Sequence, residues 1–329
     1  MERVYKGIGF GFCLLLLGAI FWIASSVFLI GFAAVLLALF LFMIGMGVKK
    51  LTHLHYRWAL FLALFAIVGI FTLIFWLYSP LIATQFSQLM EQLPKAFEEV
   101  RSTLPEMKVL TEASIQQEFF TNNKKIFSQL TKIFTVTVGS FVGFVIFILV
   151  GFYLAFDPYR YVEGGLNLIP PGKRGRGEKM VRSIGSTLQW WLLAKGLSMI
   201  AIGILVFFGL WILDVSLALI LALLAAVLAF IPYVGSILAS IPAILLAFGQ
   251  NPMTALYVVI LYLIVHALEG YLITPFLEQR TVSLPPALTI LSQILFTLLF
   301  GPLGLALATP LLVLTISMVH QWLPSESKT

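Results

Sequence analysis

The chain has 329 residues and a formal net charge of +6, and 60% of its residues are hydrophobic while only 10% are charged. A soluble domain is nearer a quarter charged, so an ordinary soluble protein is excluded. Several apolar runs reach the roughly 20 residues that a helix needs to cross a bilayer, and they are continuous, whereas barrel strands would alternate. The composition therefore predicts an all-α, polytopic helical membrane protein.

The N-terminal part of the chain is expected to hold the first three of these helices. The apolar run over 7–48 is about twice the length of one span, so we predict a helical hairpin that turns near Ser25 or Gly31. A pair of lysines follows, and short basic loops usually face the cytoplasm. The third span is predicted to end at Pro80, where the composition changes.

The middle of the chain alternates between charged and apolar stretches. Residues 80–133 carry acidic and basic side chains with apolar residues at helical spacing, which predicts amphipathic helices outside the cell. A fourth span over 134–156 leads into a basic stretch over 157–189, which predicts a cytoplasmic loop. The end of that stretch overlaps 178–193, which has the pattern of an amphipathic helix. Because the basic stretch lies beside a membrane span, anionic lipid head groups are favoured over nucleic acid as a further partner.

The C-terminal part is expected to be the transport core. Two pairs of short apolar segments, over 215–249 and 284–319, are each interrupted in the middle by Gly and Pro. Such interruptions are typical of transporter binding sites, and each pair is either two full spans or a re-entrant hairpin. Small residues and prolines recur with similar spacing in the two pairs: Gly235, Ala239 and Pro242 in the first, and Gly304, Ala308 and Pro310 in the second.

Glu269 is the leading candidate for a functional residue. It lies near the end of an apolar run that opens at Met253, and an ionisable residue at lipid depth is by default a functional hypothesis. His266 precedes it by three residues, which puts both side chains on one helical face. We predict that this pair couples transport to a proton or a cation. The alternatives are a structural hydrogen-bonded pair and a carboxylate that faces water.

The transport pathway is predicted to follow the interruptions and the polar residues near them. The residues expected to line it are Pro232, Tyr233, Gly235, Ser236, Pro242, Thr274, Pro275, Ser292, Gln293, Gly301, Gly304 and Pro310.

Neither a catalytic site, a metal site nor a cofactor is expected. The sequence has no His-Glu-x-x-His zinc pattern and no Gly-x-Gly-Asp pattern of an intramembrane aspartyl protease. The single cysteine, Cys13, leaves no intramolecular disulfide. Two other classes stay open: an intramembrane serine protease that uses Ser236 and His266, and a structural or lipid-binding membrane protein.

Four motifs stand in a particular order along the chain: Phe152-Tyr153-Leu154-Ala155-Phe156-Asp157, then Phe230-Ile231-Pro232-Tyr233-Val234-Gly235-Ser236, then Glu269 followed by Thr274-Pro275, and last Gly304-Leu305-Ala306-Leu307-Ala308-Thr309-Pro310. In this order they resemble the AI-2E family of transporters. The resemblance implies a membrane protein of about eight transmembrane helices with broken or re-entrant hairpins. It implies assembly as a ring of identical subunits, with a pentamer as the expected size. It also implies export of small signalling molecules, or exchange of monovalent cations for protons.

The sequence thus predicts a transporter in the cytoplasmic membrane of a prokaryote, with both termini inside and alternating access as the mechanism. No spacing of residues in the sequence is typical of binding a nucleotide, a sugar or a metal, and none indicates the direction of transport. The expected organisation is three spans over 1–79, an extracytoplasmic amphipathic region over 80–133, a fourth span over 134–156, a basic cytoplasmic loop over 157–189, a transport core over 190–320 and a cytoplasmic tail over 321–329.

Overall fold

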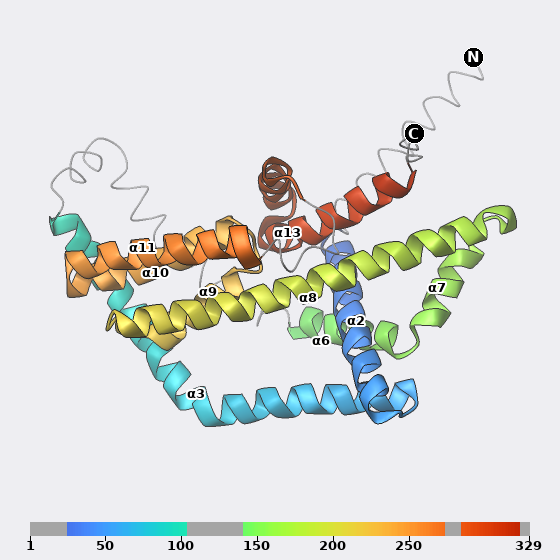
Figure 1. Ribbon diagram of the computed structural model, residues 1–329, viewed down its shortest axis with the longest axis horizontal. Helices are drawn as coiled ribbons and strands as arrows, with labels where there is room; N and C mark the ends of the chain where they lie inside the picture. Colours follow the sequence, from blue (N-terminus) through green and yellow to red (C-terminus); the bar gives the residue numbers. More distant parts are fainter. Residues whose placement is uncertain (1–24, 104–140, 274–283, 323–329) are drawn as a thin grey trace, which may run out of the picture.

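The computed structural model describes residues 25–103, 141–273 and 284–322, and every element assigned in these ranges is helical (Figure 1). Five helices are long and apolar enough to cross a membrane, or six if a bent pair counts as one span. The predicted class, a polytopic helical membrane protein, is confirmed. In chain order the elements are α2 (Ser25–Thr52), α3 (Tyr56–Thr103), α6 (Phe141–Phe156), α7 (Pro158–Asn167), η1 (Pro171–Lys173), α8 (Arg174–Ile212), α9 (Ala218–Leu228), α10 (Val234–Gln250), α11 (Pro252–Leu268), η2 (Glu269–Ile273) and α13 (Pro286–Trp322).

α2 packs against both α3 and α6, and apolar side chains from the three helices share a core. Because α2 is helical from Ser25 onward, a turn at Gly31 is wrong; the partner helix expected before Ser25 falls outside the described ranges. The start of α3 is tied to the end of α6: the Tyr56 hydroxyl donates to the Ala155 carbonyl, and Arg57 pairs with Asp157 at 3.3 Å. The segments after α2 and after α6, both predicted to be cytoplasmic, therefore adjoin.

α3 continues as a helix through Pro80 to Thr103, while the part of it that is apolar enough to cross a membrane is Tyr56–Ile74. The end of the third membrane span near Pro80 stays a prediction. Proline in a helix kinks it when tertiary contacts hold both sides, and α3 bends along its length (Figure 1). Buried contacts hold the part of α3 that follows Pro80. Leu89 and Ala96 are buried in the core shared with α10, and the Gln85 side chain accepts a hydrogen bond from the Ile220 N–H at the start of α9. The described part of the predicted extracytoplasmic region thus belongs to the helical core.

Most of the basic segment over 157–189 is helical, and its location on the cytoplasmic side stays a prediction. α7 turns away from α6 by 87°, and proline at its first position is favourable there because that N–H has no helical acceptor. After a short turn, α8 begins at Arg174, whose Nε donates to the Ile169 carbonyl at 3.1 Å. The predicted amphipathic helix is the first part of α8.

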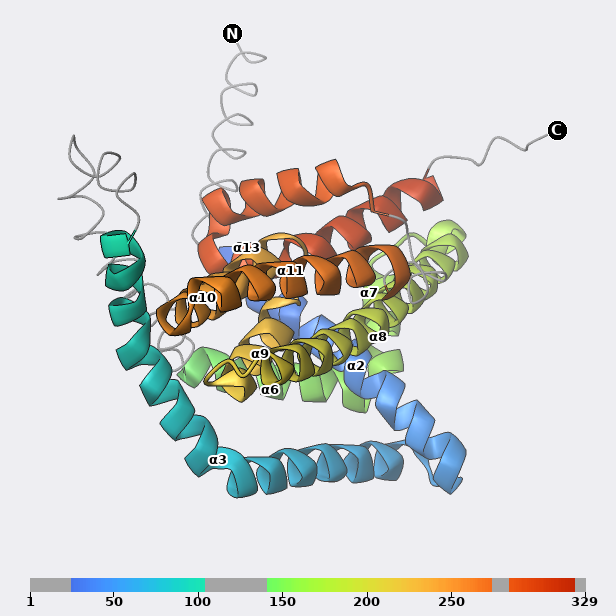
Figure 2. The same ribbon diagram turned by 60° about the vertical axis from the view of Figure 1, so that its left-hand side comes forward.

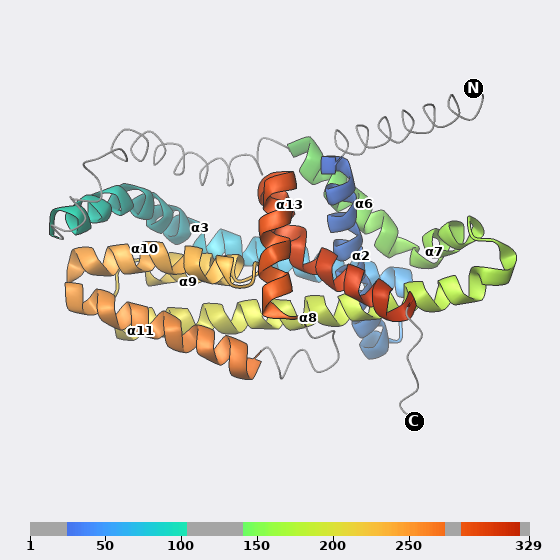
Figure 3. The same cartoon turned by 90° about the horizontal axis from the view of Figure 1, so that it is seen from above.

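α8 packs against N-terminal helices and against helices of the C-terminal part. It contacts α2 and α13 along one part, and α9 and α11 along another. Helices α8 to α11 lie alongside one another (Figure 3) and share an apolar core with Val206, Leu221, Ala243 and Val258 fully or almost fully buried. A side chain near the middle of α8 is therefore placed between the N-terminal helices and the broken segments of the C-terminal part.

Candidate transport site

The chain breaks between α9 and α10 with an unusual tight turn. Tyr233 has φ 62 and ψ −64, and the Val234 N–H donates to the Pro232 carbonyl at 2.7 Å across it. This is the geometry of a γ-turn of the rare, strained kind. α10 starts directly afterwards, and a Cβ on Gly235 would lie 1.8 Å from the Leu228 carbonyl oxygen. Only glycine permits this close approach of the two helix ends.

α13 breaks in a comparable way. Gly301 has φ 65 and ψ −149, a region that is essentially restricted to glycine, and the chain reverses there (Figure 2). Three residues further on, a Cβ on Gly304 would lie 2.0 Å from the Phe296 carbonyl oxygen. Gly235 and Gly304 therefore serve the same purpose, because each allows the arm after a break to approach a carbonyl of the arm before it. Whether either pair of arms is re-entrant stays a prediction.

Gln293 joins the first arm of α13 to the break between α9 and α10. Its Nε2 donates to the Pro232 carbonyl at 2.9 Å, and its side chain is buried, with a residue exposure of 1%. The carbonyl of Pro232 thus accepts from both Gln293 and Val234. A buried amide that bonds to irregular backbone supplies a partner that a regular helix would otherwise provide. Gln293 is therefore a positioning residue for the first break.

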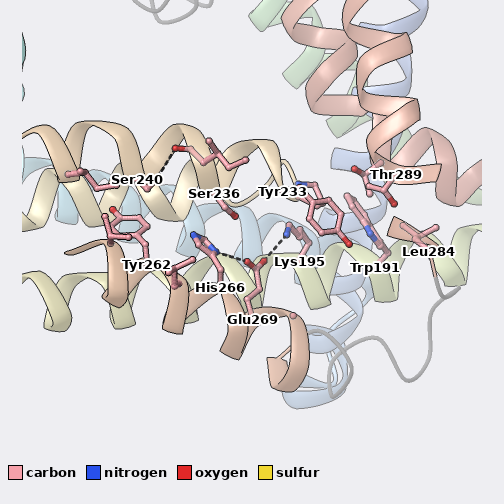
Figure 4. A pocket seen from close by; sticks show the side chains of 17 residues that line it. Trp191, Lys195, Tyr233, Ser236, Ser240, Tyr262, His266, Glu269, Leu284 and Thr289 are labelled. Carbon is pink, nitrogen blue, oxygen red and sulfur yellow. Dashed lines mark hydrogen bonds and ion pairs between the residues drawn. The ribbon is translucent and has the colours of Figure 1, made fainter. Parts of the chain in front are cut away.

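A pocket of about 470 Å³ lies beside these breaks (Figure 4). Five parts of the chain meet around it, and the residues that line it include Trp191 and Lys195 from α8, Pro232 and Tyr233 from the first break, Ser236 and Ser240 from α10, Tyr262 and His266 from α11, and Thr289 and Thr309 from α13. Its walls are largely apolar with a few polar groups, as is usual for pockets that bind small molecules.

One end of the pocket holds a charged cluster around Glu269 (Figure 4). Glu269 Oε1 lies 3.3 Å from Lys195 Nζ and accepts a hydrogen bond from the Ser198 hydroxyl at 3.2 Å, while Oε2 lies 3.3 Å from His266 Nδ1. The side chains of Lys195 and Glu269 are 10% and 14% exposed. Because the carboxylate has a close cationic partner, its charge is compensated although it is largely removed from solvent.

Several polar atoms of the pocket have no hydrogen-bond partner among the described residues. They are the Tyr262 hydroxyl, His266 Nε2 and Thr309 Oγ1, all three buried. Buried polar atoms are nearly always satisfied, so exceptions in a concave site indicate a bound water or ligand. Gln293 Oε1 is a fourth atom of this kind next to the first break.

The predicted residues divide into three sets. Pro232, Tyr233, Ser236, His266 and Glu269 line the pocket. Gly235, Gly301, Gly304 and Gln293 shape the breaks beside it. Pro242, Ser292 and Pro310 are buried within helices, and the Ser292 hydroxyl donates to the Thr289 carbonyl of its own helix. Thr274 and Pro275 lie outside the described residues.

The sequence analysis did not predict several pocket residues, among them Trp191, Ser240, Tyr262, Thr289 and Thr309, and the most consequential of them is Lys195. It is the only charged residue between Ser183 and Leu213, and this was the available signal. Its partner is 74 residues away in the sequence, so the ion pair itself could not be read from spacing. In the described ranges, no group of three or more His, Cys, Asp and Glu side chains could hold a metal ion.

The fold and the pocket define a polytopic helical membrane protein with an internal, solute-sized site. The chain matches the model of the AI-2E family transporters over residues 12–324, and it belongs to that family.

Three relatives illustrate the likeness. The putative transport protein YueF of Bacillus subtilis (strain 168) is 29% identical over 187 residues, which are 57% of this chain and 51% of that protein. The AI-2 transport protein TqsA of Escherichia coli (strain K12) is 32% identical over 147 residues, 44% of this chain and 42% of TqsA. The putative permease PerM of the same strain is 26% identical over 282 residues, 81% of this chain and 79% of PerM. The chain thus spans about half the length of YueF and somewhat less of TqsA.

Proposed function

We propose that this protein moves a small solute across the membrane through the pocket between α8, α10, α11 and α13, by alternating access with Glu269 as the proton-coupling residue. The observation that carries the proposal is the pocket itself: about 470 Å³, next to two broken helices and with a charged cluster at one end. Binding sites beside discontinuous helices are a recurring feature of secondary transporters.

The size of the pocket favours an organic solute over a bare ion. Pockets for small molecules range from about 300 to 1,000 Å³, and this volume falls within that range. The name of the relative TqsA refers to transport of AI-2, so a small signalling molecule is one candidate for this chain. Exchange of monovalent cations for protons is the second candidate, because Glu269 is a carboxylate in a largely enclosed site.

The two other classes receive less support. Ser236 and His266 line one pocket, yet His266 Nε2 has no hydrogen-bond partner among the described residues, whereas a serine–histidine dyad requires that bond. A purely structural role leaves the charged cluster and the unsatisfied polar atoms of the pocket without a purpose.

Flux through purified protein in liposomes tests the proposal, with candidate solutes supplied in the presence and absence of a pH gradient. Ser236→Phe should block flux by filling the pocket, while Ser236→Ala should retain most of it. Loss of all activity in Ser236→Ala would instead favour the serine protease. Absence of flux for every solute and cation tested would favour the structural class.

The ring-shaped homo-oligomer expected from the family resemblance also belongs to this proposal. Native mass spectrometry in a mild detergent measures the number of subunits, and a monomer as the only species would count against the ring.

A further inference from the structure

Glu269 carries oxygen atoms that suit a small cation. It lies where α11 passes directly into the π-helical turn η2, and its side chain lines the pocket. The Ser198 hydroxyl, 3.2 Å from Glu269 Oε1, adds another oxygen at the same place. Ionisable side chains at membrane depth mark ion pathways, so this carboxylate and hydroxyl are a candidate environment for a small cation.

The ammonium group of Lys195 already occupies this environment. Its Nζ lies 3.3 Å from Glu269 Oε1, the same oxygen that accepts the hydrogen bond from Ser198 (Figure 4). The side chain comes from α8, which packs against η2, and it is only 10% exposed. An amine on a tether at this distance excludes a second cation from Oε1 by charge and by volume.

The other groups that face Glu269 do not replace Lys195 in this respect. His266 lies 3.3 Å from the second carboxylate oxygen, Oε2, and is charged only when protonated. The two tyrosines that line the pocket, Tyr233 and Tyr262, carry no positive charge. Among the described residues, α10 and α13 contribute only uncharged side chains to the pocket. Lys195 is therefore the one permanent cation at this end of the pocket in the described part of the chain.

We propose that Lys195 is a resident cation: its ammonium takes the position at Glu269 that an alkali cation would fill in a cation-coupled carrier, so this protein binds no Na⁺, K⁺ or Li⁺ there. The inference rests on the proposed function and deepens it, since it makes the proton, and not an alkali cation, the coupling ion of the carrier. It thereby decides against the second candidate, exchange of alkali cations for protons at Glu269. It also identifies Lys195 as a specificity-determining residue. Removing its amine should convert the Glu269 site into one that an alkali cation can occupy.

Thermal unfolding in detergent tests this without a known solute. Melting temperatures are measured in NaCl, KCl and LiCl against choline chloride at equal ionic strength, for the wild type, Glu269→Gln, Lys195→Met, Lys195→Arg and the double variant Lys195→Met/Glu269→Gln. We expect the wild type and Lys195→Arg to show no difference between alkali and choline salts. The melting temperature of Lys195→Met should rise by roughly 2 °C for each tenfold increase of the alkali-cation concentration above the dissociation constant, because only the folded state binds the cation. The double variant should lose this gain.

Two outcomes would overturn the proposal. One is an alkali-specific stabilisation of the wild type that Glu269→Gln removes, because a cation would then bind beside Lys195. The other is a folded Lys195→Met protein that no alkali cation stabilises. If Lys195→Met does not fold stably in choline chloride, recovery of its melting transition in an alkali salt supports the proposal. If neither Lys195→Met nor Lys195→Gln is stabilised by any alkali salt, the proposal is overturned. Because the readout is binding, a failure here is distinct from an absence of solute flux.

Discussion

The contacts of Glu269 define the chemistry of the pocket at the scale of single residues. One carboxylate oxygen meets Lys195 and Ser198 and the other meets His266, so both oxygens have partners while the side chain is largely enclosed. A carboxylate in this position can release its partners when it takes up a proton, and a glutamine cannot. The side chain is therefore suited to link a change of charge to a change of access.

The first prediction concerns Glu269→Gln. The substitution keeps the shape of the side chain and removes both its charge and its proton exchange. We expect a folded protein whose flux no longer depends on pH, because the group that changes its protonation during the cycle is absent. Flux in liposomes across a range of pH, together with the elution profile of the purified variant, provides the measurement.

Glu91→Gln is the matched control for that experiment. Glu91 lies on α3 and pairs with Lys95 at 2.7 Å, with both side chains mostly exposed. The hydrogen bond and the charge of Lys95 lower the pKa of Glu91, so this carboxylate is ionised throughout the neutral range and has no proton to exchange there. Its replacement should leave the pH profile of transport unchanged. A well-folded Glu269→Gln protein with the same pH profile as Glu91→Gln would contradict the coupling role.

The second prediction concerns Gln293. Gln293→Leu removes the donor to the Pro232 carbonyl in a fully buried place, so we expect a destabilisation of about 1–3 kcal/mol and a change in transport rate. Ser292→Ala, its neighbour, loses only a hydrogen bond within the helix and should cost less than about 1 kcal/mol. Unfolding in detergent compares the two. Equal stabilities of the two variants would show that the hydrogen bond from Gln293 to the Pro232 carbonyl contributes little to the free energy of unfolding.

The sequence could predict part of the site at this scale and no more. The spacing of His266 and Glu269 places both on one helical face, and the structure finds them in contact. Lys195 and Gln293 are different, because their partners are 74 and 61 residues away. Contacts of that kind depend on how helices pack, and periodicity within one segment contains no information about them.

At the scale of elements, glycine and proline predicted breaks well only where no packing competes. The interruptions near Pro232 and Gly301 are breaks in the structure, with a γ-turn at one and a glycine-only conformation at the other. Pro80 was predicted to end the third membrane span, yet the helix itself continues through it, because the part of α3 that follows is held by buried contacts and by the Gln85–Ile220 hydrogen bond. Local signals give the propensity to break, and tertiary contacts decide whether the chain does so.

The third prediction tests the two glycines that follow the breaks. Gly235→Ala and Gly304→Ala each place a methyl group within 2.0 Å of a backbone carbonyl oxygen, which cannot move as a side chain can. We expect each to lose about 3 kcal/mol of stability or to fail to fold. The fraction of protein that elutes as a single folded species, and its melting temperature, measure this.

Gly196→Ala is the control, because a Cβ at Gly196 in α8 meets no atom within 4 Å. Alanine is the better helix former by up to about 1 kcal/mol, so this variant should be as stable as the wild type or more stable. If Gly235→Ala and Gly304→Ala were as stable as the control, the conclusion that the arms approach each other closely at the breaks would be wrong.

At the scale of the whole molecule, contacts between segments support the predicted orientation in the membrane. The Arg57–Asp157 ion pair and the bond from Tyr56 to the Ala155 carbonyl bring the start of α3 next to the end of α6. The segments before and after these points are basic, and basic segments beside membrane spans face the cytoplasm. α3 leads away from this side and α6 returns to it, so the chain between them should emerge on the opposite side.

The last prediction tests this orientation with single cysteines. Cys13→Ser provides a background free of other thiols, and new cysteines are placed at Gly175 and at Gln117. Gly175 is suitable because a Cβ there meets no atom within 4 Å. We expect a membrane-impermeant maleimide to label the cysteine at 117 from outside intact cells, and the cysteine at 175 only in inverted vesicles. Labelling of both from the same side would refute the orientation and, with it, the prediction that the basic segment over 157–189 faces the cytoplasm. Each cysteine must also react fully in detergent, so that lack of labelling in membranes reports sidedness and not burial.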